Sequence, residues 1–135
     1  MKILVCEVQC QRLSYALYQL DGASCLLASG SAAGIGTAEG SYFHTNADLG
    51  DSVRIAARFP SWREAVCAML EHLFGGCIDS LEDIAAVALA GQDGDAADAL
   101  RSMLPHTALF PVSSSGLSAA QEAAALFGAT HRKGE

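Results

Sequence analysis

Acidic side chains stand at two points where predicted strands end. Glu7 lies near the end of the first apolar run, and Asp93 and Asp95 belong to the turn 91–95, which follows a second apolar run. Carboxylates at the ends of neighbouring strands can hold a divalent metal ion for phosphoryl or nuclease chemistry. Asp93 and Asp95 also precede a predicted helix, whose dipole they would complement. Helix capping is the simpler interpretation of this turn, and the sequence leaves both open.

A run of serines precedes the last predicted helix. Ser113, Ser114 and Ser115 are followed by Gly116, so their hydroxyls and the backbone amides can cradle a phosphate group, or they form a plain N-cap. Arg12 is the cation nearest the first strand, and it is either an anion-binding group or a solvated loop residue. The predicted ligand-binding residues are Glu7, Arg12, Asp93, Ser113, Ser114 and Ser115.

The cysteines and histidines are not spaced as metal ligands. The chain has five cysteines, an odd number at irregular spacings, and four histidines with no partner at ligand spacing. We therefore predict no disulfide framework and no metal site, and most cysteines should be small buried apolar residues. The residues concerned are Cys6, Cys10, Cys25, Cys67 and Cys77, and His44, His72, His106 and His131.

Composition limits the classes of protein and partner. With 135 residues, 51% of them hydrophobic and 17% charged, the chain suits one compact domain and not a disordered segment. A formal charge of −7 opposes binding to nucleic acid and to anionic lipid. The apolar start is too short for a signal peptide or a membrane span, so we expect a cytoplasmic location.

Strands are predicted first along the chain. Residues 3–8 are nearly continuously apolar, which is typical of a central strand buried on both faces. Alternating patterns and turn residues predict further strands, with Asp21-Gly22 as a hairpin turn, and residues 53–58 read as an edge strand with a basic face. The other predicted strands are 13–18, 24–29, 41–45, 84–89 and 107–112.

Three helices complete the pattern. Ser61 and Glu64 form an S-x-x-E capping box before an apolar periodicity that ends at Gly75-Gly76. A short helix over 95–104 stops at Pro105, and a last helix over 117–127 ends at Gly128.

The element order is β-β-β-α-β-α-β-α, with extra strands before the first helix. Antiparallel strands extended by right-handed crossovers give a mixed sheet of five or more strands with helices on its faces. We therefore predict a single α/β domain of the ribonuclease H-like type over residues 1–128, followed by a frayed tail over 129–135.

Segments in this order resemble the acetate kinase family. The N-terminal M-K-I-L-V resembles the family's first strand, and G-I-G within residues 31–45 resembles its R-I-G-I segment. The matching segments are 1–5, 13–17, 31–45, 58–74, 80–87 and, after a jump, L-F-P-V-S at 109–113 with the helix that follows. The family's nucleotide-binding half falls in that jump, so the resemblance implies one half of an acetate kinase-like fold, truncated and degenerate.

The residues that hold metal and phosphate in the family are changed here. Acetate kinases follow their first strand with N-A-G-S-S-S-L-K, whereas residues 7–14 read E-V-Q-C-Q-R-L-S. Glu7 replaces the Asn, Ser14 replaces the Lys, and the side chains of Val8 and Gln9 would crowd a phosphate.

The other two family sites are also changed. The family's G-H-R segment, whose Arg clamps the acyl phosphate, corresponds to A-L-A at residues 88–90. Ser114 and Ser115 replace its metal-contacting acidic pair. Loss of one such charge-stabilising group costs about 3 kcal/mol or more of transition-state stabilisation, and several are lost together.

We therefore expect a pseudoenzyme: a non-catalytic interaction or regulatory protein that forms a homodimer or binds a partner protein through an apolar face. A first alternative is a residual acetate or propionate kinase-type phosphotransferase that borrows a nucleotide lobe from a partner. No cofactor is expected; Mg²⁺ and ATP would be needed only for such residual activity.

A second alternative comes from another resemblance. The segment L-S-Y-A-L at residues 13–17 resembles the partner subunits of tRNA threonylcarbamoyl transfer, which share this half-fold. That family's G-P-G-S-F-T stretch would fall at residues 92–97, which read Q-D-G-D-A-A and do not match.

Overall fold

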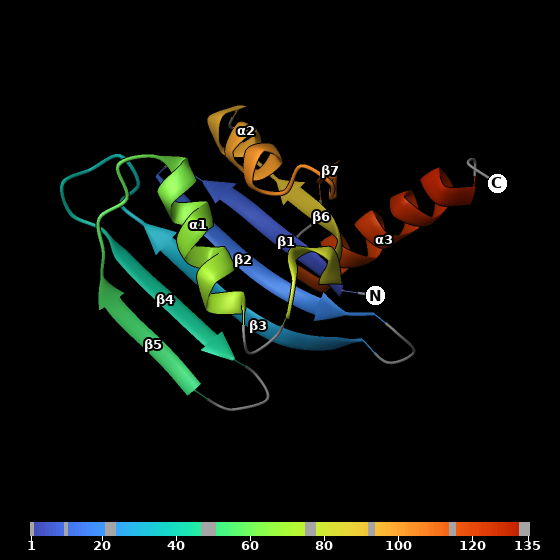
Figure 1. Ribbon diagram of the computed structural model, residues 1–135, viewed down its shortest axis with the longest axis horizontal. Coiled ribbons are helices and arrows are strands. Elements are labelled where there is room, and N and C mark those ends of the chain that lie inside the picture. The colour runs from blue at the N-terminus through green and yellow to red at the C-terminus, as the bar shows by residue number, and fades with distance from the viewer. Residues whose placement is uncertain are drawn as a thin grey trace.

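The computed structural model describes residues 2–9, 11–20, 24–46, 51–74, 78–91, 94–113 and 116–132. These residues form one mixed sheet of seven strands flanked by three α-helices (Figure 1). The strands are β1 (Lys2–Gln9), β2 (Arg12–Gln19), β3 (Cys25–Ala33), β4 (Ser41–Asn46), β5 (Asp51–Ala56), β6 (Ile84–Ala90) and β7 (Ala108–Val112). The helices are α1 (Trp62–Leu73), α2 (Gly94–Met103) and α3 (Gly116–Arg132), with a 3₁₀ turn, η1 (Leu81–Asp83), before β6.

The sheet has the order β5-β4-β3-β2-β1-β6-β7. The pairs from β1 to β5 are antiparallel, whereas β1 pairs with β6, and β6 with β7, in parallel. This topology confirms the predicted single α/β domain of the ribonuclease H-like type, including the extra strands before the first helix.

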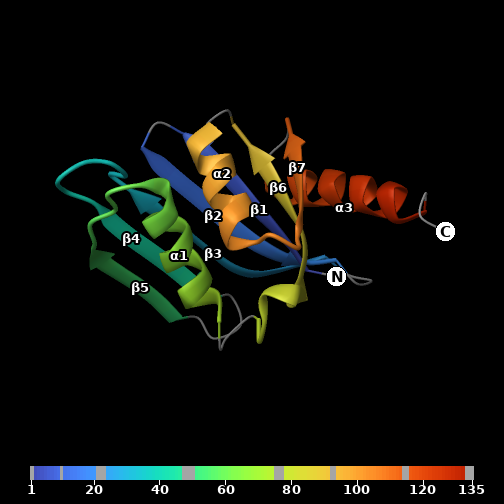
Figure 2. The same cartoon turned by 45° about the horizontal axis from the view of Figure 1, so that its top comes forward.

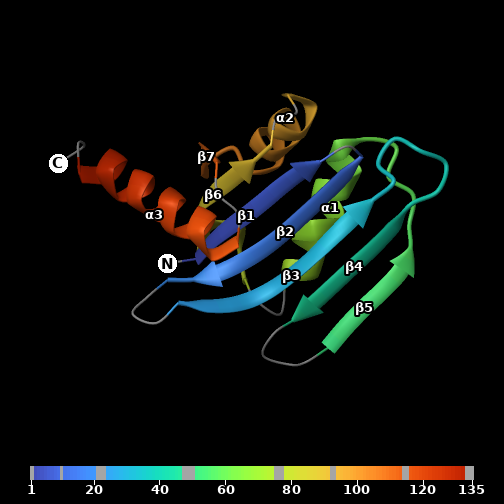
Figure 3. The same cartoon turned by 180° about the vertical axis from the view of Figure 1, so that it is seen from behind.

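Strand β1 lies between β2 and β6 and is buried on both faces. Ile3, Leu4, Val5 and Cys6 are each at most 1% exposed. Leu4 and Cys6 join a core with α1 and α2, whereas Ile3 and Val5 join a smaller core with α3. The helices accordingly lie on opposite faces, α1 and α2 on one (Figure 2) and α3 on the other (Figure 3).

Helix α3 approaches the sheet through small side chains. Ala119, Ala120 and Ala123 are fully buried and share a core with Ala86 and Ala88 of β6. The helix then continues past the β7 edge of the sheet (Figure 2).

The predicted end of this last helix at Gly128 is wrong, because α3 runs to Arg132. A glycine inside a helix costs only about 1 kcal/mol relative to alanine, so an alanine-rich helix can continue through it.

Helix α1 begins after Ser61, as predicted, but only half of the predicted capping box forms: the Glu64 carboxylate accepts a hydrogen bond from the Ser61 backbone, and the bond from the Ser61 side chain is absent. The Ser61 hydroxyl donates to the Glu64 carboxylate and makes no side-chain bond to the helix backbone. A full capping box forms instead at η1, between Ser80 and Asp83. The Asp83 carboxylate accepts hydrogen bonds from the amides of Asp79 and Ser80 at 2.7 and 3.3 Å, and these bonds lower its pKa.

The two edges of the sheet differ. On β5, Val53 and Ile55 are 38% and 44% exposed, because α1 packs mainly over β3, which β4 separates from β5. Arg54 lies on the opposite face, 4.9 Å from the ring centre of Phe43. On β7, the edge strand contains Pro111, which has no N–H to donate.

Some predicted turns lie outside the described residues, namely Asp21-Gly22 and Gly75-Gly76. Within the described part of the chain, no helix is long and apolar enough to cross a membrane.

The β1–β2 hairpin is as short as a hairpin can be. The ladder continues to the pair Gln9 and Arg12, so two residues make the turn. Gln11 has φ 57, the only positive φ of a non-glycine residue in the described segments. Its carbonyl accepts a hydrogen bond from Ile35 N at 3.0 Å, which ties the hairpin to the β3–β4 connection.

Replacing Gln11 with glycine should stabilise the protein. A left-handed backbone costs an L-residue roughly 1–2 kcal/mol, and glycine avoids that cost but loses more entropy on folding, so we expect a net gain of about 1 kcal/mol in unfolding free energy. Urea denaturation measures the change. Gln9→Gly, in the adjacent strand, is the matched control and should destabilise; equal losses in both variants would contradict a left-handed Gln11.

Candidate functional site

The carboxyl ends of β1 and β6 are where ligands bind in open α/β sheets. Here neighbouring backbone crowds both strand ends. The two-residue hairpin follows β1, and Gly91 follows β6 with φ +104. A Cβ on Gly91 would lie 2.3 Å from the carbonyl oxygen of Val8, so Gly91 rests directly on the end of β1.

The described residues that the sequence predicted as ligands are dispersed around this end. Glu7 is half-buried on β1, opposite Ser14 and Ala90 of the neighbouring strands. Arg12 is exposed at the start of β2, and Ser113 is exposed after β7. Asp93, Ser114 and Ser115 lie outside the described residues.

Glu7 and Asp95 lie on opposite faces of the sheet. Glu7 shares the face of Ile3 and Val5, which α3 covers, whereas Asp95 lies in the first turn of α2, on the other face. Among the residues that the structure describes, no group of three or more His, Cys, Asp and Glu side chains is arranged to hold a metal ion. The two described carboxylates of the predicted cluster therefore do not come together.

Glu7 also affects the start of α3. Tyr18 Oη lies 3.7 Å from the position that a Cβ on Gly116 would occupy, so Tyr18 reaches the first residue of the helix. Burial raises the pKa of Tyr18, and the negative charge of Glu7 raises it further. A carboxylate so placed repels an anion at this helix N-terminus, which weighs against a phosphate cradle there.

Asp95 lines a cavity of about 470 Å³ between α1, α2 and the β3–β4 connection. Its charged lining residues are Arg63, Asp95 and Asp98, so two carboxylates face one guanidinium. This balance of charge does not favour a phosphate group.

A hydrogen-bonded cluster of aromatic residues lies between the sheet and α1. Tyr15 on β2 bonds to Tyr42 on β4 and, at 2.5 Å, to Nδ1 of His44. His44 Nε2 lies 2.8 Å from Asn46 Oδ1. A neutral imidazole with its proton on Nε2 donates to Asn46 and accepts from Tyr15, so it satisfies both bonds. The His72 ring from α1 completes the cluster, with its centre 4.5 Å from that of Tyr42.

Burial sets the protonation of this cluster. Tyr15, Tyr42 and His44 are each at most 3% exposed. Burial lowers the pKa of His44 and raises that of Tyr42 to about 12, so both side chains are held neutral. Tyr15, Tyr42 and His44 therefore act as buried packing groups, and together with the half-buried His72 they stabilise the packing of α1 on the sheet.

Sequence reasoning missed this cluster because it tested histidines only for spacing as metal ligands. The available signal was the inward position of each residue on its strand. Gly30 on β3 is a second sequence signal for the cluster. A Cβ at this position would lie 2.5 Å from Tyr15 Oη, so the strand needs glycine where the Tyr15 side chain crosses it.

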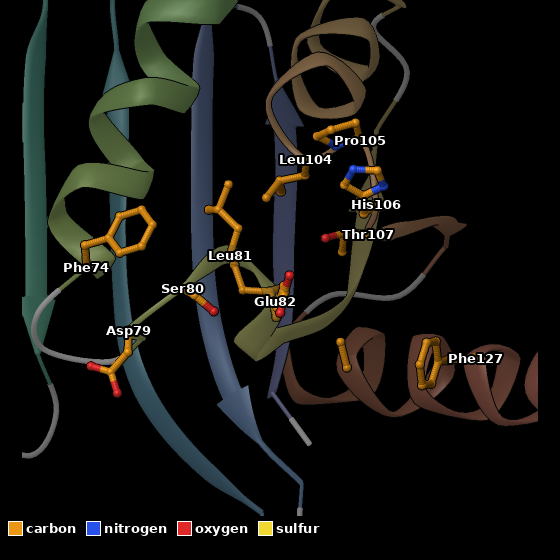
Figure 4. Close-up of a pocket in the computed structure, with 12 residues that line it drawn as sticks. Phe74, Asp79, Ser80, Leu81, Glu82, Leu104, Pro105, His106, Thr107 and Phe127 are labelled. Atoms are coloured by element: carbon orange, nitrogen blue, oxygen red, sulfur yellow. The ribbon is translucent and has the colours of Figure 1, made fainter.

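Another cavity, of about 830 Å³, lies at the other end of the parallel strands (Figure 4). Its walls are η1, the start of β6, the α2–β7 connection and α3. None of the predicted ligand residues lines it.

Comparison with known structures agrees with this architecture. The crystal structure of Porphyromonas gingivalis acetate kinase is similar to this chain, with a TM-score of 0.72 and 20% sequence identity over 82% of the chain. The fold is acetate kinase-like. The chain spans 36% of the length of that kinase, and the likeness at this identity concerns the fold alone. No protein-family model and no curated protein matches the sequence.

The free energy of unfolding should fall when a lower pH protonates His44. Because the folded state lowers the pKa of His44 below its ordinary value of 6.5, the unfolded chain binds this proton first as the pH drops. The contribution of neutral His44 to stability is therefore complete above pH 6.5 and is lost below it.

Urea denaturation between roughly pH 7 and pH 5 measures this loss. His44→Gln should be less stable than the natural protein at pH 7 and should lose less stability over this range. His106→Gln, on the exposed α2–β7 connection and outside the cluster, is the control for the substitution itself. An unchanged slope in His44→Gln would contradict the assignment.

Proposed function

We propose that this chain is an acetate kinase-like domain without kinase activity that works as an interaction or regulatory protein. The observation that carries the proposal is the two-residue hairpin after β1. A phosphate-binding turn needs backbone amides free to approach the ligand. Here the β1–β2 ladder runs to Gln9 and Arg12, and the carbonyl of Gln11 is bonded to Ile35.

The second altered site supports the same proposal. Residues 88–90, which correspond to the family's G-H-R segment, form the end of β6. Ala88 and Leu89 are buried, and Ala90 pairs with Glu7 and Val112. No guanidinium or imidazole is supplied from these positions, and Glu7 brings negative charge where a transferring phosphoryl group needs positive charge.

The connection between β6 and β7 supports the absence of a nucleotide lobe. Seventeen residues, 91–107, join the two strands, and α2 occupies ten of them. A nucleotide-binding half of ordinary domain size does not fit in this connection. A residual phosphotransferase would therefore need that lobe, with Mg²⁺ and ATP, from another chain.

The edge strand β5 supplies the contact surface in this proposal. It presents an unpaired backbone edge together with the exposed side chains of Val53 and Ile55. A second copy fits this edge in an antiparallel two-fold pairing centred on Val53. In that register Val53 faces its symmetry mate and Arg54 faces Ser52, so no like charges stand opposite each other.

Purified protein should show no ATP turnover with acetate or propionate in the presence of Mg²⁺. Each lost charge-stabilising group raises the barrier by about 3 kcal/mol, so the combined loss places turnover below detection. A coupled assay for ADP, with an active acetate kinase as positive control, makes the measurement. Turnover that disappears in Glu7→Ala would overturn the proposal and favour a residual phosphotransferase.

Light scattering should give about twice the monomer mass of 14.0 kDa. Val53→Asp should convert the protein to folded monomers, because the dimer would bury the new carboxylate without a partner, and circular dichroism should show that the secondary structure is kept. Leu117→Asp on α3, where the natural side chain is also 38% exposed, is the matched control and should remain dimeric. A natural protein that is monomeric, or a Val53→Asp variant that still dimerises, would exclude this interface.

A further inference from the structure

The 830 Å³ cavity at the amino ends of β6 and β7 has the size of a small-molecule site (Figure 4). It lies at the opposite end of the sheet from the hairpin and Gly91, so it is separate from every site discussed above. Its apolar lining residues are Phe74, Leu81, Ile84, Ala85, Leu104, Pro105 and Phe127, and its polar ones are Asp79, Ser80, Glu82, His106 and Thr107.

Local hydrogen bonds hold the walls in place before any ligand arrives. The capping box between Ser80 and Asp83 fixes η1, which carries Leu81 and Glu82 into the cavity wall. On the other side, Thr107 N donates to the carbonyl of Leu104 at 3.2 Å and closes the turn after α2. Because these turns are already ordered, little conformational entropy is lost when a ligand binds.

The interior of the cavity is apolar. Ile84 and Leu104 are 2% and 3% exposed and form its floor. Phe127 reaches it from α3, one helical turn beyond Ala123, where the helix extends past β7. Figure 4 shows that Phe127 and Leu81 come from different elements, α3 and η1, and both line the cavity.

The charged residues of the lining determine which ligand charge the cavity favours. The lining holds two exposed carboxylates, those of Asp79 and Glu82, and no Lys or Arg among the described residues. The nearby Asp83 carboxylate is engaged by backbone amides and also feels the positive charge of Lys2, so Asp83 and Lys2 together add no net charge to this region. In Figure 4 Glu82 lies toward Thr107 and His106, so these three polar side chains stand at one part of the wall. Such a wall attracts a cation and repels a carboxylate or phosphate.

We propose that this cavity binds a small organic cation with an apolar body, an aliphatic or aromatic amine. The apolar part occupies the space between Leu81, Leu104 and Phe127, and the ammonium group meets the Glu82 carboxylate. Thr107 and His106 offer further hydrogen-bonding groups beside it. This site is independent of the proposed β5 interface.

A pair of probes with opposite charge tests the proposal. 2-Phenylethylamine and 3-phenylpropionate share an aromatic ring and differ in charge, and each is titrated into ¹⁵N-labelled full-length protein. The amine should shift amide signals of η1, the start of β6 and the α2–β7 connection, and should bind at least tenfold more tightly than the acid. Equal affinities, or no binding of the amine at millimolar concentration, would overturn the proposal.

Variants locate the site. Glu82→Gln should weaken amine binding about tenfold and reduce the preference over the acid. Asp98→Asn removes the same charge from exposed α2 and should leave both affinities unchanged. Ala85→Phe should fill the cavity and abolish amine binding, with melting temperature measured to verify folding. Unchanged amine affinity in Glu82→Gln, or in a folded Ala85→Phe, would show that the ligand binds elsewhere.

Discussion

The structure depends on one strand that must be buried on both sides. Side chains of β1 alternate between two cores, with Leu4 and Cys6 on one face and Ile3 and Val5 on the other. A strand of this kind is stable only when a helical layer covers each face of the sheet. The layers of α1 and α2 on one side and of α3 on the other follow from this requirement. Burial also raises the pKa of the Cys6 thiol to about 12, so this cysteine is a packing residue without nucleophilic character.

The two cores are built from different side chains. Under α1 and α2 the core contains large residues such as Met69, Leu73 and Leu100, whereas α3 meets the sheet almost entirely through alanines. Small side chains bring the α3 backbone close to β6 but bury less apolar area for each residue. The hydrophobic contribution to stability is therefore concentrated on the α1 side, where the tyrosine and histidine cluster also lies.

Much of the fold could be predicted from local sequence patterns. The apolar run at residues 3–8 and the alternation at 53–58 each identified a strand and its place in the sheet, and the helical periodicity after Pro60 identified α1. Features made by several distant segments could not be predicted in this way. Tyr15, Tyr42 and His44 meet only because three strands are in register, and each is an ordinary inward residue on its own strand. The exposure of Val53 and Ile55 depends on which strands α1 covers. The sequence around β5 does not encode the position of that helix.

The proline in β7 has a consequence for how copies of this sheet could associate. A sheet with two equivalent open edges can add molecules end to end without limit, which is the route to fibres. Here one edge strand, β7, lacks an N–H at Pro111 and therefore offers an incomplete ladder, whereas β5 has no such interruption among its described residues. In the proposed dimer, pairing between two β5 edges leaves only β7 as an open edge of the described sheet, and its interrupted ladder disfavours further pairing. A dimer of this kind would therefore close at two molecules and would not extend into a fibre.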